Sequence, residues 1–169
     1  MICVHTVEVN EPMNYDNKPT VKIFRPVFDY FDTLIKERNF RLETGGILIG
    51  TLHPLKNEIH LTDLTTPQRM DRQLPYRFIR NSAGHQEIMD DLWRKSNYEK
   101  LYLGEWHSHN ERHPTPSPLD TRNWLQITNK KQNTSQMLFA IVGIDEFRVW
   151  TVANQTITPL AKELLYYVK

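Results

Sequence analysis

The segment of residues 107–120, with the sequence HSHNERHPTPSPLD, is the feature that most restricts how this chain can fold. It follows residues 101–106, whose large apolar and aromatic side chains favour a strand. Proline fixes φ and has no amide hydrogen, so the three alternating prolines predict a stiff, extended loop. The chain holds seven histidines and ten prolines, and three of each lie within this one segment. A strand is therefore expected to lead through a stiff loop into the start of a helix.

The histidines and the aspartate of this segment are spaced to hold one metal ion. Residues i and i+2 of a strand face the same side, so His107 and His109 present two imidazoles at the end of the strand. Ser117 suits the N-cap of a helix, Pro118 its first position and Asp120 its third. Zinc at a catalytic site takes three protein ligands and water. His107, His109 and Asp120 are therefore candidate zinc ligands.

Each half of this pattern also occurs for ordinary structural reasons. An H-x-H pair on a strand is most often structural or exposed, and S-P-x-D is most often a capping box. Together within 14 residues they supply three ligands of suitable type, which favours a metal site. His113 is the competing ligand and ranks lower, because it lies off the i, i+2 face in the proline-rich loop.

A zinc hydrolase also needs a general base for the water that it activates. Glu43 is a candidate from a distant segment, where it precedes Thr44-Gly45-Gly46. Glu105 shares the strand face of His107 and could support the site or be structural, and Glu111 is most simply a solvated loop charge. The residue pattern alone does not choose among the three glutamates.

Strands and helices are expected to alternate along the chain, which predicts an α/β fold of mixed, three-layer type. Apolar stripes at helical spacing predict a helix behind Pro26, a second within residues 83–96 and a third from Ser117 with Trp124 in the core. Gly45 and Gly46 before a strand indicate close backbone approach. Strands are expected at residues 2–9, 47–49, 58–64, 76–79, 101–107, 136–144, 147–152 and 156–160, and an exposed loop at 67–75.

Charge and hydropathy exclude several classes of protein. Lys and Arg number 21 against 20 Asp and Glu, so the chain lacks the long-range attraction of basic proteins to nucleic acid. The longest apolar stretch, residues 137–144, is far shorter than the roughly 20 residues of a membrane span. Residues 1–20 do not have the pattern of a secretory signal, and Cys3 is the single cysteine, so a cytoplasmic location is expected.

Five positions of the chain resemble the signature of the JAB/JAMM (MPN+) metalloproteases. Glu43 is followed by His107-Ser108-His109, seven residues, Ser117, two residues and Asp120, which matches the family spacing without gaps. The segment ETGGILIG, which begins at Glu43, is similar to the Glu-bearing segment of the family. The resemblance covers roughly residues 22–150.

This resemblance implies a central curved mixed β-sheet flanked by helices, in a single domain of residues 1–169 with 1–20 as an N-terminal extension. It implies one Zn²⁺ per chain, held by the three candidate ligands, with Glu43 as general base. The Ser117 hydroxyl would donate to the developing oxyanion, cap the helix, or do both. Glu105 would support the ligands from behind, and Trp106 would form a wall of the site.

A narrower resemblance is to the bacterial JAB proteins of CBASS anti-phage operons. It rests on GEWHSH at residues 104–109, the approach to Ser117, Trp124 and an upstream FIR…HQ…W pattern from Phe78 to Trp93. In that group the enzyme releases a cGAS/DncV-like nucleotidyltransferase, a CD-NTase, from the proteins to which an E1/E2-like ligase attaches it. The resemblance thus implies an isopeptidase with a protein substrate and no nucleic-acid or membrane partner.

Two alternatives remain open at this point. The chain could instead be a JAB protease for another bacterial ubiquitin-like modifier. A non-catalytic MPN interaction module is the third hypothesis, against which the intact five-position motif argues.

Overall fold

The computed structural model of the protein describes residues 18–130, 136–162 and 165–168. The strand expected at residues 2–9 lies outside these ranges. The helices in the described part are α1 (Arg25–Glu37), α2 (Ser82–Lys95), α3 (Pro118–Lys130) and the short 3-10 turn η1 (Pro54–Lys56). The strands are β1 (Thr20–Phe24), β2 (Gly45–His53), β3 (Glu58–Leu64), β4 (Arg72–Leu74), β5 (Arg77–Ile79), β6 (Leu101–Ser108), β7 (Gln136–Val142), β8 (Phe147–Ala153), β9 (Thr156–Pro159) and β10 (Leu165–Val168).

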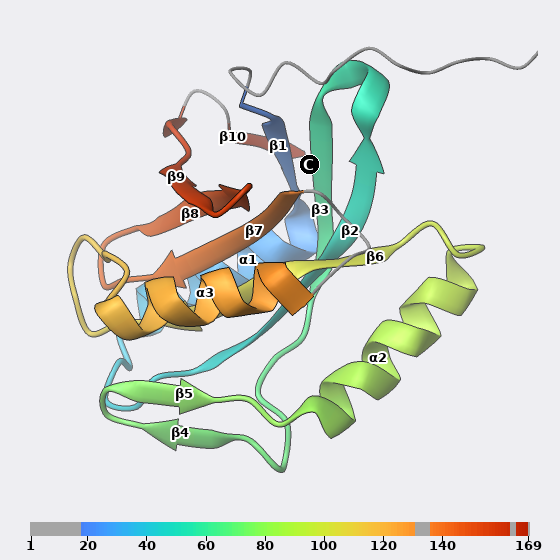
Figure 1. The fold of residues 1–169 in the computed structure, drawn as a ribbon. Helices are drawn as coiled ribbons and strands as arrows, with labels where there is room; N and C mark the ends of the chain where they lie inside the picture. The colour runs from blue at the N-terminus through green and yellow to red at the C-terminus, as the bar shows by residue number, and fades with distance from the viewer. Residues whose placement is uncertain (1–17, 131–135, 163–164, 169) are drawn as a thin grey trace, which may run out of the picture.

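Eight of the strands form one curled, mixed sheet in the order β10-β1-β3-β2-β6-β7-β8-β9 (Figure 1). β1 runs parallel to β10 and β3, and β6 runs parallel to β7, while the other pairs are antiparallel. The connection from β6 to β7 passes through α3, as parallel neighbours require a crossover. This is the α/β fold of mixed type that the sequence predicted.

The side chains of β7 alternate between two cores, one on each face of the sheet. Leu138, Ala140 and Val142 join the core that contains residues of α1. The intervening residues join Trp124 of α3, which stacks on Phe139 with ring centroids 4.8 Å apart. Trp124 is therefore a core residue, as its helical spacing predicted, and α1 and α3 cover opposite faces of the sheet (Figure 1). None of the described helices has the length and apolarity to cross a membrane.

The prediction that residues 67–75 form an exposed loop is wrong in two respects. Residues 72–74 form β4, which pairs with β5 as an antiparallel hairpin. The Asp71 side chain is only 1% exposed, because it binds His85, a partner 14 residues away. The strand expected at residues 76–79 is confirmed as β5, whereas its three-residue partner β4 is too short to show an alternating pattern.

The predicted close approach at the glycine pair is confirmed. A Cβ on Gly45 would lie 2.7 Å from the Trp106 carbonyl oxygen of β6. A Cβ on Gly46 would lie 2.0 Å from the carbonyl oxygen of Thr65. Both glycines therefore allow neighbouring backbone segments to pack against the beginning of β2.

Gly46→Ala is expected to destabilise the fold by about 1–3 kcal/mol, because the clash is with backbone that cannot rotate away. Gly84→Ala is the matched control, since there the new Cβ would meet only Gln68 side-chain atoms at 3.0–3.1 Å. Helix propensity favours alanine at that position in α2. Denaturant unfolding measures both variants, and equal stability of the two would contradict the argument.

Candidate metal centre

The two imidazoles lie where β6 ends, beside the segment that leads into β2. Gly45 of β2 pairs with His107 of β6, so the residues before Gly45 run alongside those after His107. The Ser108 amide donates to the Thr44 carbonyl at 2.8 Å, and the Thr44 amide donates to the Ser108 hydroxyl at 3.0 Å. These two bonds bring the Glu43 segment to the H-x-H pair, although it lies 64 residues earlier in the sequence.

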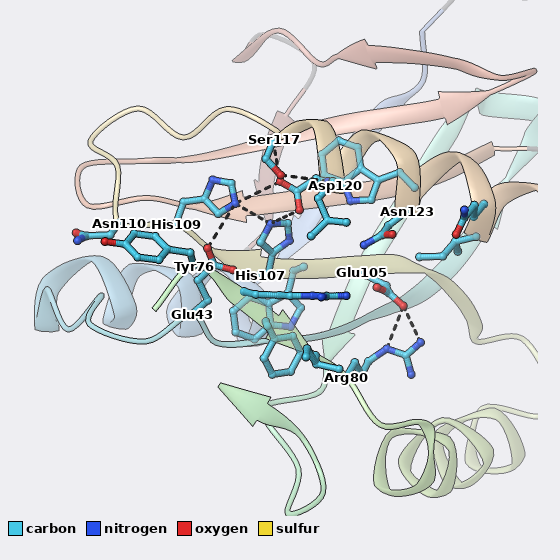
Figure 2. Close-up of a pocket in the computed structure, with 18 of the residues that line it drawn as sticks. Glu43, Tyr76, Arg80, Glu105, His107, His109, Asn110, Ser117, Asp120 and Asn123 are labelled. Atoms are coloured by element: carbon cyan, nitrogen blue, oxygen red, sulfur yellow. Dashed lines mark hydrogen bonds and ion pairs between the residues drawn. The ribbon is translucent and has the colours of Figure 1, made fainter. Parts of the chain in front are cut away.

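Four side chains converge at this point (Figure 2). The Nε2 atoms of His107 and His109 lie 3.0 Å apart. The carboxylate of Asp120 contacts both, with Oδ1 at 3.2 Å from His107 Nε2 and Oδ2 at 3.4 Å from His109 Nε2. Glu43 Oε1 lies 3.9 Å from His109 Nε2. The structure thus brings Glu43 to the side of the three candidate ligands, whereas Glu111 contacts His109 at the other ring nitrogen, Nδ1.

The donor set and its spacing fit a zinc ion. Tetrahedral coordination with bonds of about 2.0–2.1 Å places ligand atoms about 3.3 Å from one another. The Nε2 and Oδ atoms of His107, His109 and Asp120 are 3.0–3.4 Å apart. Two neutral imidazoles and one carboxylate are a ligand combination that zinc accepts at catalytic sites. Glu43, His107 and His109 also have ligand atoms within 4.8 Å of one another.

The start of α3 positions the carboxylate. The Ser117 amide donates to Asp120 Oδ2 at 2.7 Å, and the Asp120 amide donates to Ser117 Oγ at 3.2 Å. This reciprocal pair is a capping box, the structural role that the sequence offered for S-P-x-D. The Ser117 hydroxyl accepts a bond there, and it also hydrogen-bonds to the Asp120 carboxylate, so both groups are held at the start of the helix.

The charges of the site favour a cation between the carboxylates. Burial would raise the pKa of Asp120, but hydrogen bonds from His107 and His109 outweigh it and hold the pKa well below its ordinary value. Burial would lower the pKa of His109, but Asp120 and Glu43 more than offset this, so the pKa is raised. Burial, helped by the Asp120 carboxylate, raises the pKa of Glu43 despite the two histidines. Glu43 is thus more basic than an exposed glutamate.

The loop between His109 and Ser117 is tied to the turn after β7. The His109 amide donates to the Val142 carbonyl at 2.9 Å, and the Ile144 amide donates to the Glu111 carbonyl at 2.7 Å. The Glu111 carboxylate accepts from the Thr115 amide at 3.0 Å and lies 3.7 Å from His109 Nδ1. Glu111 therefore organises the loop.

His113, the competing ligand in the sequence, lies outside the cluster. Its Nδ1 contacts Glu146 Oε1 at 3.0 Å, and its side chain is 64% exposed. The Glu146 carboxylate also binds Arg148 and Lys162, so His113 belongs to a separate group of charges.

Glu105 and Trp106 are further from the converging side chains. Glu105 Oε1 accepts from Arg80 Nε at 3.0 Å and Nη2 at 2.6 Å (Figure 2). Trp106 lines the cleft, but its side chain is 1% exposed and packs against Phe31 in the core. Its indole N–H donates to the Thr65 carbonyl at 2.9 Å.

The cluster opens into a cleft of about 510 Å³ between the β4–β5 hairpin and α3. Tyr76 and Phe78 of the hairpin and Arg80, which follows it, line one side of the cleft. Asn123 of α3 lines the other side (Figure 2). The hairpin also holds Glu43: the Glu43 amide donates to the Leu74 carbonyl at 2.8 Å, and the Phe78 amide bonds to the Glu43 carboxylate. The sequence indicated a strand at residues 76–79 and an FIR motif from Phe78, but it gave no sign that this segment pairs with β4 or holds Glu43.

Comparisons with known proteins agree on one family. The family model described as prokaryotic homologs of the JAB domain matches residues 34–153. The chain is 30% identical over 128 residues to a CD-NTase/cGAS isopeptidase of Pseudomonas aeruginosa, covering 76% of this chain and 80% of that protein. Relatives with the same name in Escherichia coli and Vibrio cholerae are each 30% identical, over 73% and 71% of this chain and 76% and 74% of their own lengths.

A solved structure supports the fold independently. The solution structure of protein DSY2949 from Desulfitobacterium hafniense superposes with a TM-score of 0.61 over 88% of this chain and 93% of that one. The two sequences are 14% identical, so this similarity concerns the fold alone.

Proposed function

This chain belongs to the family of prokaryotic homologs of the JAB domain, and from that premise we propose that it is a zinc-dependent isopeptidase that releases a CD-NTase from its protein conjugates. The observation that carries the proposal is the convergence of Glu43, His107, His109 and Asp120 at the floor of an open cleft. The relatives named CD-NTase/cGAS isopeptidase supply the class of substrate.

His107, His109 and Asp120 would hold the zinc ion, one per chain. Bound there, zinc would supply Lewis-acid chemistry, which lowers the pKa of water from 15.7 towards about 7 and polarises a carbonyl group. Glu43, held by the hairpin within 3.9 Å of His109, would accept a proton from the attacking water and pass it to the leaving amine. Its raised pKa suits a group that must take up a proton and then release it.

Ser117 would donate a hydrogen bond from its hydroxyl to the oxyanion that forms when water adds to the carbonyl of the isopeptide bond. The capping box fixes Oγ beside Asp120, so the donor is in place before the substrate binds. Glu105 with Arg80 and Trp106 would shape the cleft beside the reacting bond.

Ser117→Gly separates the two roles of this serine. Glycine at an N-cap costs only a few tenths of a kcal/mol in stability. Loss of an oxyanion donor lowers kcat by about 10²–10³-fold. We expect the variant to keep its thermal stability and to lose kcat by this factor, as measured with a purified conjugate. An unchanged kcat would leave Ser117 with the capping role alone.

The direct test of the function is incubation with a CD-NTase conjugate, with and without a chelator, read by intact mass. We expect release of the CD-NTase with its C-terminal residue intact, and no release once the chelator is added. A conjugate of a bacterial ubiquitin-like protein, tested in parallel, separates the two substrate classes. Cleavage of the second conjugate only would replace the proposed substrate, and cleavage of neither by the zinc-loaded protein would overturn the proposal.

We further propose that the conjugates are made by an E1/E2-like ligase, and that the protein acts in the cytoplasm as a single JAB domain. The near-neutral charge of +1 supports an enzyme that binds the tail of a protein substrate rather than a nucleic acid.

A further inference from the structure

A second group of polar side chains is buried outside the metal centre and takes no part in the proposed chemistry. It consists of Thr65, directly after β3, Asp71, directly before β4, and His85, in α2. The side chains of Asp71 and His85 are each 1% exposed, and Thr65 is 2% exposed. Buried polar groups of this kind are costly unless they are fully hydrogen-bonded, so their partners show what they hold together.

The three side chains form one continuous row of hydrogen bonds. Asp71 Oδ2 lies 2.8 Å from His85 Nε2, and His85 Nδ1 lies 2.6 Å from Thr65 Oγ1. Thr65 Oγ1 also accepts from the Ile47 amide at 2.9 Å. A neutral His85 protonated on Nε2 satisfies every contact, since it donates to Asp71 and accepts the Thr65 hydroxyl proton. We call this row the Asp71–His85–Thr65 chain.

One end of this chain closes the base of the β4–β5 hairpin. Asp71 Oδ2 accepts from the Gln68 amide at 2.6 Å, before β4, and Oδ1 accepts from the Asn81 amide at 2.7 Å, after β5. A single carboxylate therefore binds the chain on both sides of the hairpin. Burial would raise the pKa of Asp71, but these amides and His85 outweigh it, so the carboxylate is ionised at neutral pH.

The other end joins the two strands that lead to the metal centre. The Thr65 amide donates to the Ile47 carbonyl of β2 at 3.0 Å, and the Thr65 carbonyl accepts from the Trp106 indole of β6 at 2.9 Å. Ile47 lies four residues after Glu43, and Trp106 directly precedes His107. The same buried chain thus connects the hairpin that holds Glu43 to β2, which directly follows the Glu43 segment, and to β6, which carries His107.

We propose that Asp71, His85 and Thr65 are positioning residues, which hold the β4–β5 hairpin in the register that orients the carboxylate of Glu43. They act through the two bonds of the hairpin to Glu43, from the Glu43 amide to Leu74 and from the Phe78 amide to the carboxylate. The inference rests on the proposed function, in which Glu43 is the general base. A displacement of about 1 Å in a catalytic group can cost about 10²-fold in rate, so a loosened hairpin should be visible in kcat.

The test compares Asp71→Ala with Asp63→Ala in the zinc-loaded, full-length chain. Asp63 is a matched control, since it is a partly buried aspartate of β3 that pairs with Lys100 outside the Asp71–His85–Thr65 chain. At a temperature well below that at which the variant unfolds, we expect Asp71→Ala to lower kcat by about 10–100-fold. The variant should still bind one zinc ion per chain. In NMR hydrogen exchange, the amides of Glu43 and Phe78 should lose protection while those of β7 and β8 keep it. Asp63→Ala should match the wild type in all three measurements.

A second pair of variants covers the case in which Asp71→Ala does not fold. Thr65→Ser keeps the hydroxyl and should behave like the wild type. Thr65→Val removes the hydroxyl, so its kcat should fall and the amides of Glu43 and Phe78 should exchange faster. Wild-type kcat with wild-type protection in a folded Asp71→Ala, or equal behaviour of the two Thr65 variants, would overturn the proposal. Amide exchange decides the question even if the wild type cleaves no conjugate, so the two proposals can fail separately.

Discussion

Glu43→Gln is expected to slow cleavage of a conjugate by about 10²–10⁴-fold, the range that a positioned general base contributes. Glutamine has nearly the same shape and can still contact the hairpin, but it accepts no proton from water. The three candidate ligands are unchanged, so the variant should keep its fold and its zinc. The rate is measured by intact mass, and the zinc content by elemental analysis of the same sample.

Glu111→Gln is the comparison that makes this test specific. Glu111 is a second glutamate close to a candidate ligand, at 3.7 Å from His109, but its side chain is 49% exposed and binds the loop amide of Thr115. We expect a far smaller loss for Glu111→Gln than for Glu43→Gln. A Glu43→Gln variant that cleaves at the wild-type rate, or a reversed order of the two losses, would show that the base has been assigned wrongly.

His109→Gln should abolish both zinc binding and cleavage, because it removes one of the three ligand atoms that lie 3.0–3.4 Å apart. The loss of metal affinity should exceed the roughly 10–100-fold that follows from loss of a contact outside the ligand set. Zinc at 100 times its Kd should stabilise the wild type by about 2.7 kcal/mol and leave His109→Gln unaffected. Thermal unfolding with and without zinc measures this difference without reference to activity.

His113→Gln provides the matched control four residues away. His113 is exposed and binds Glu146, so its loss should leave about one zinc per chain and near wild-type cleavage. If His113→Gln loses the metal and His109→Gln keeps it, the ligand set derived from the i, i+2 geometry is incorrect.

The local part of the candidate site could be predicted from the sequence. The i, i+2 relation of His107 and His109 and the capping box of Ser117 and Asp120 each depend on a few neighbouring residues. The close approach at Gly46 could also be predicted, since a glycine pair directly before a buried strand leaves room for a neighbouring backbone where a Cβ would clash. The mixed α/β fold could be predicted as well, because the spacing of apolar residues shows which positions of each helix or strand are buried.

The remaining parts depend on contacts between distant segments. Glu43, Glu105 and Glu111 are equivalent as bases until the pairing of β2 with β6 places Glu43 beside His109. The polar residues around Asp71 in the sequence are typical of an exposed loop. Its burial could not be predicted, because its partner His85 reaches it only when α2 packs against this segment. The strand at β5 was predicted, but its pairing with β4 and its bonds to Glu43 join separate segments, so they could not be predicted from a local pattern.

The crossover from β6 through α3 to β7 has a consequence for the order in which the centre assembles. All three candidate ligands lie within 14 consecutive residues, whereas Glu43 must arrive from 64 residues before His107. By loop-closure entropy, bringing in the distant segment costs about 1.3 kcal/mol more than closing the local one. The three candidate ligands can therefore be brought together by local contacts, whereas Glu43 joins them only through the pairing of β2 with β6.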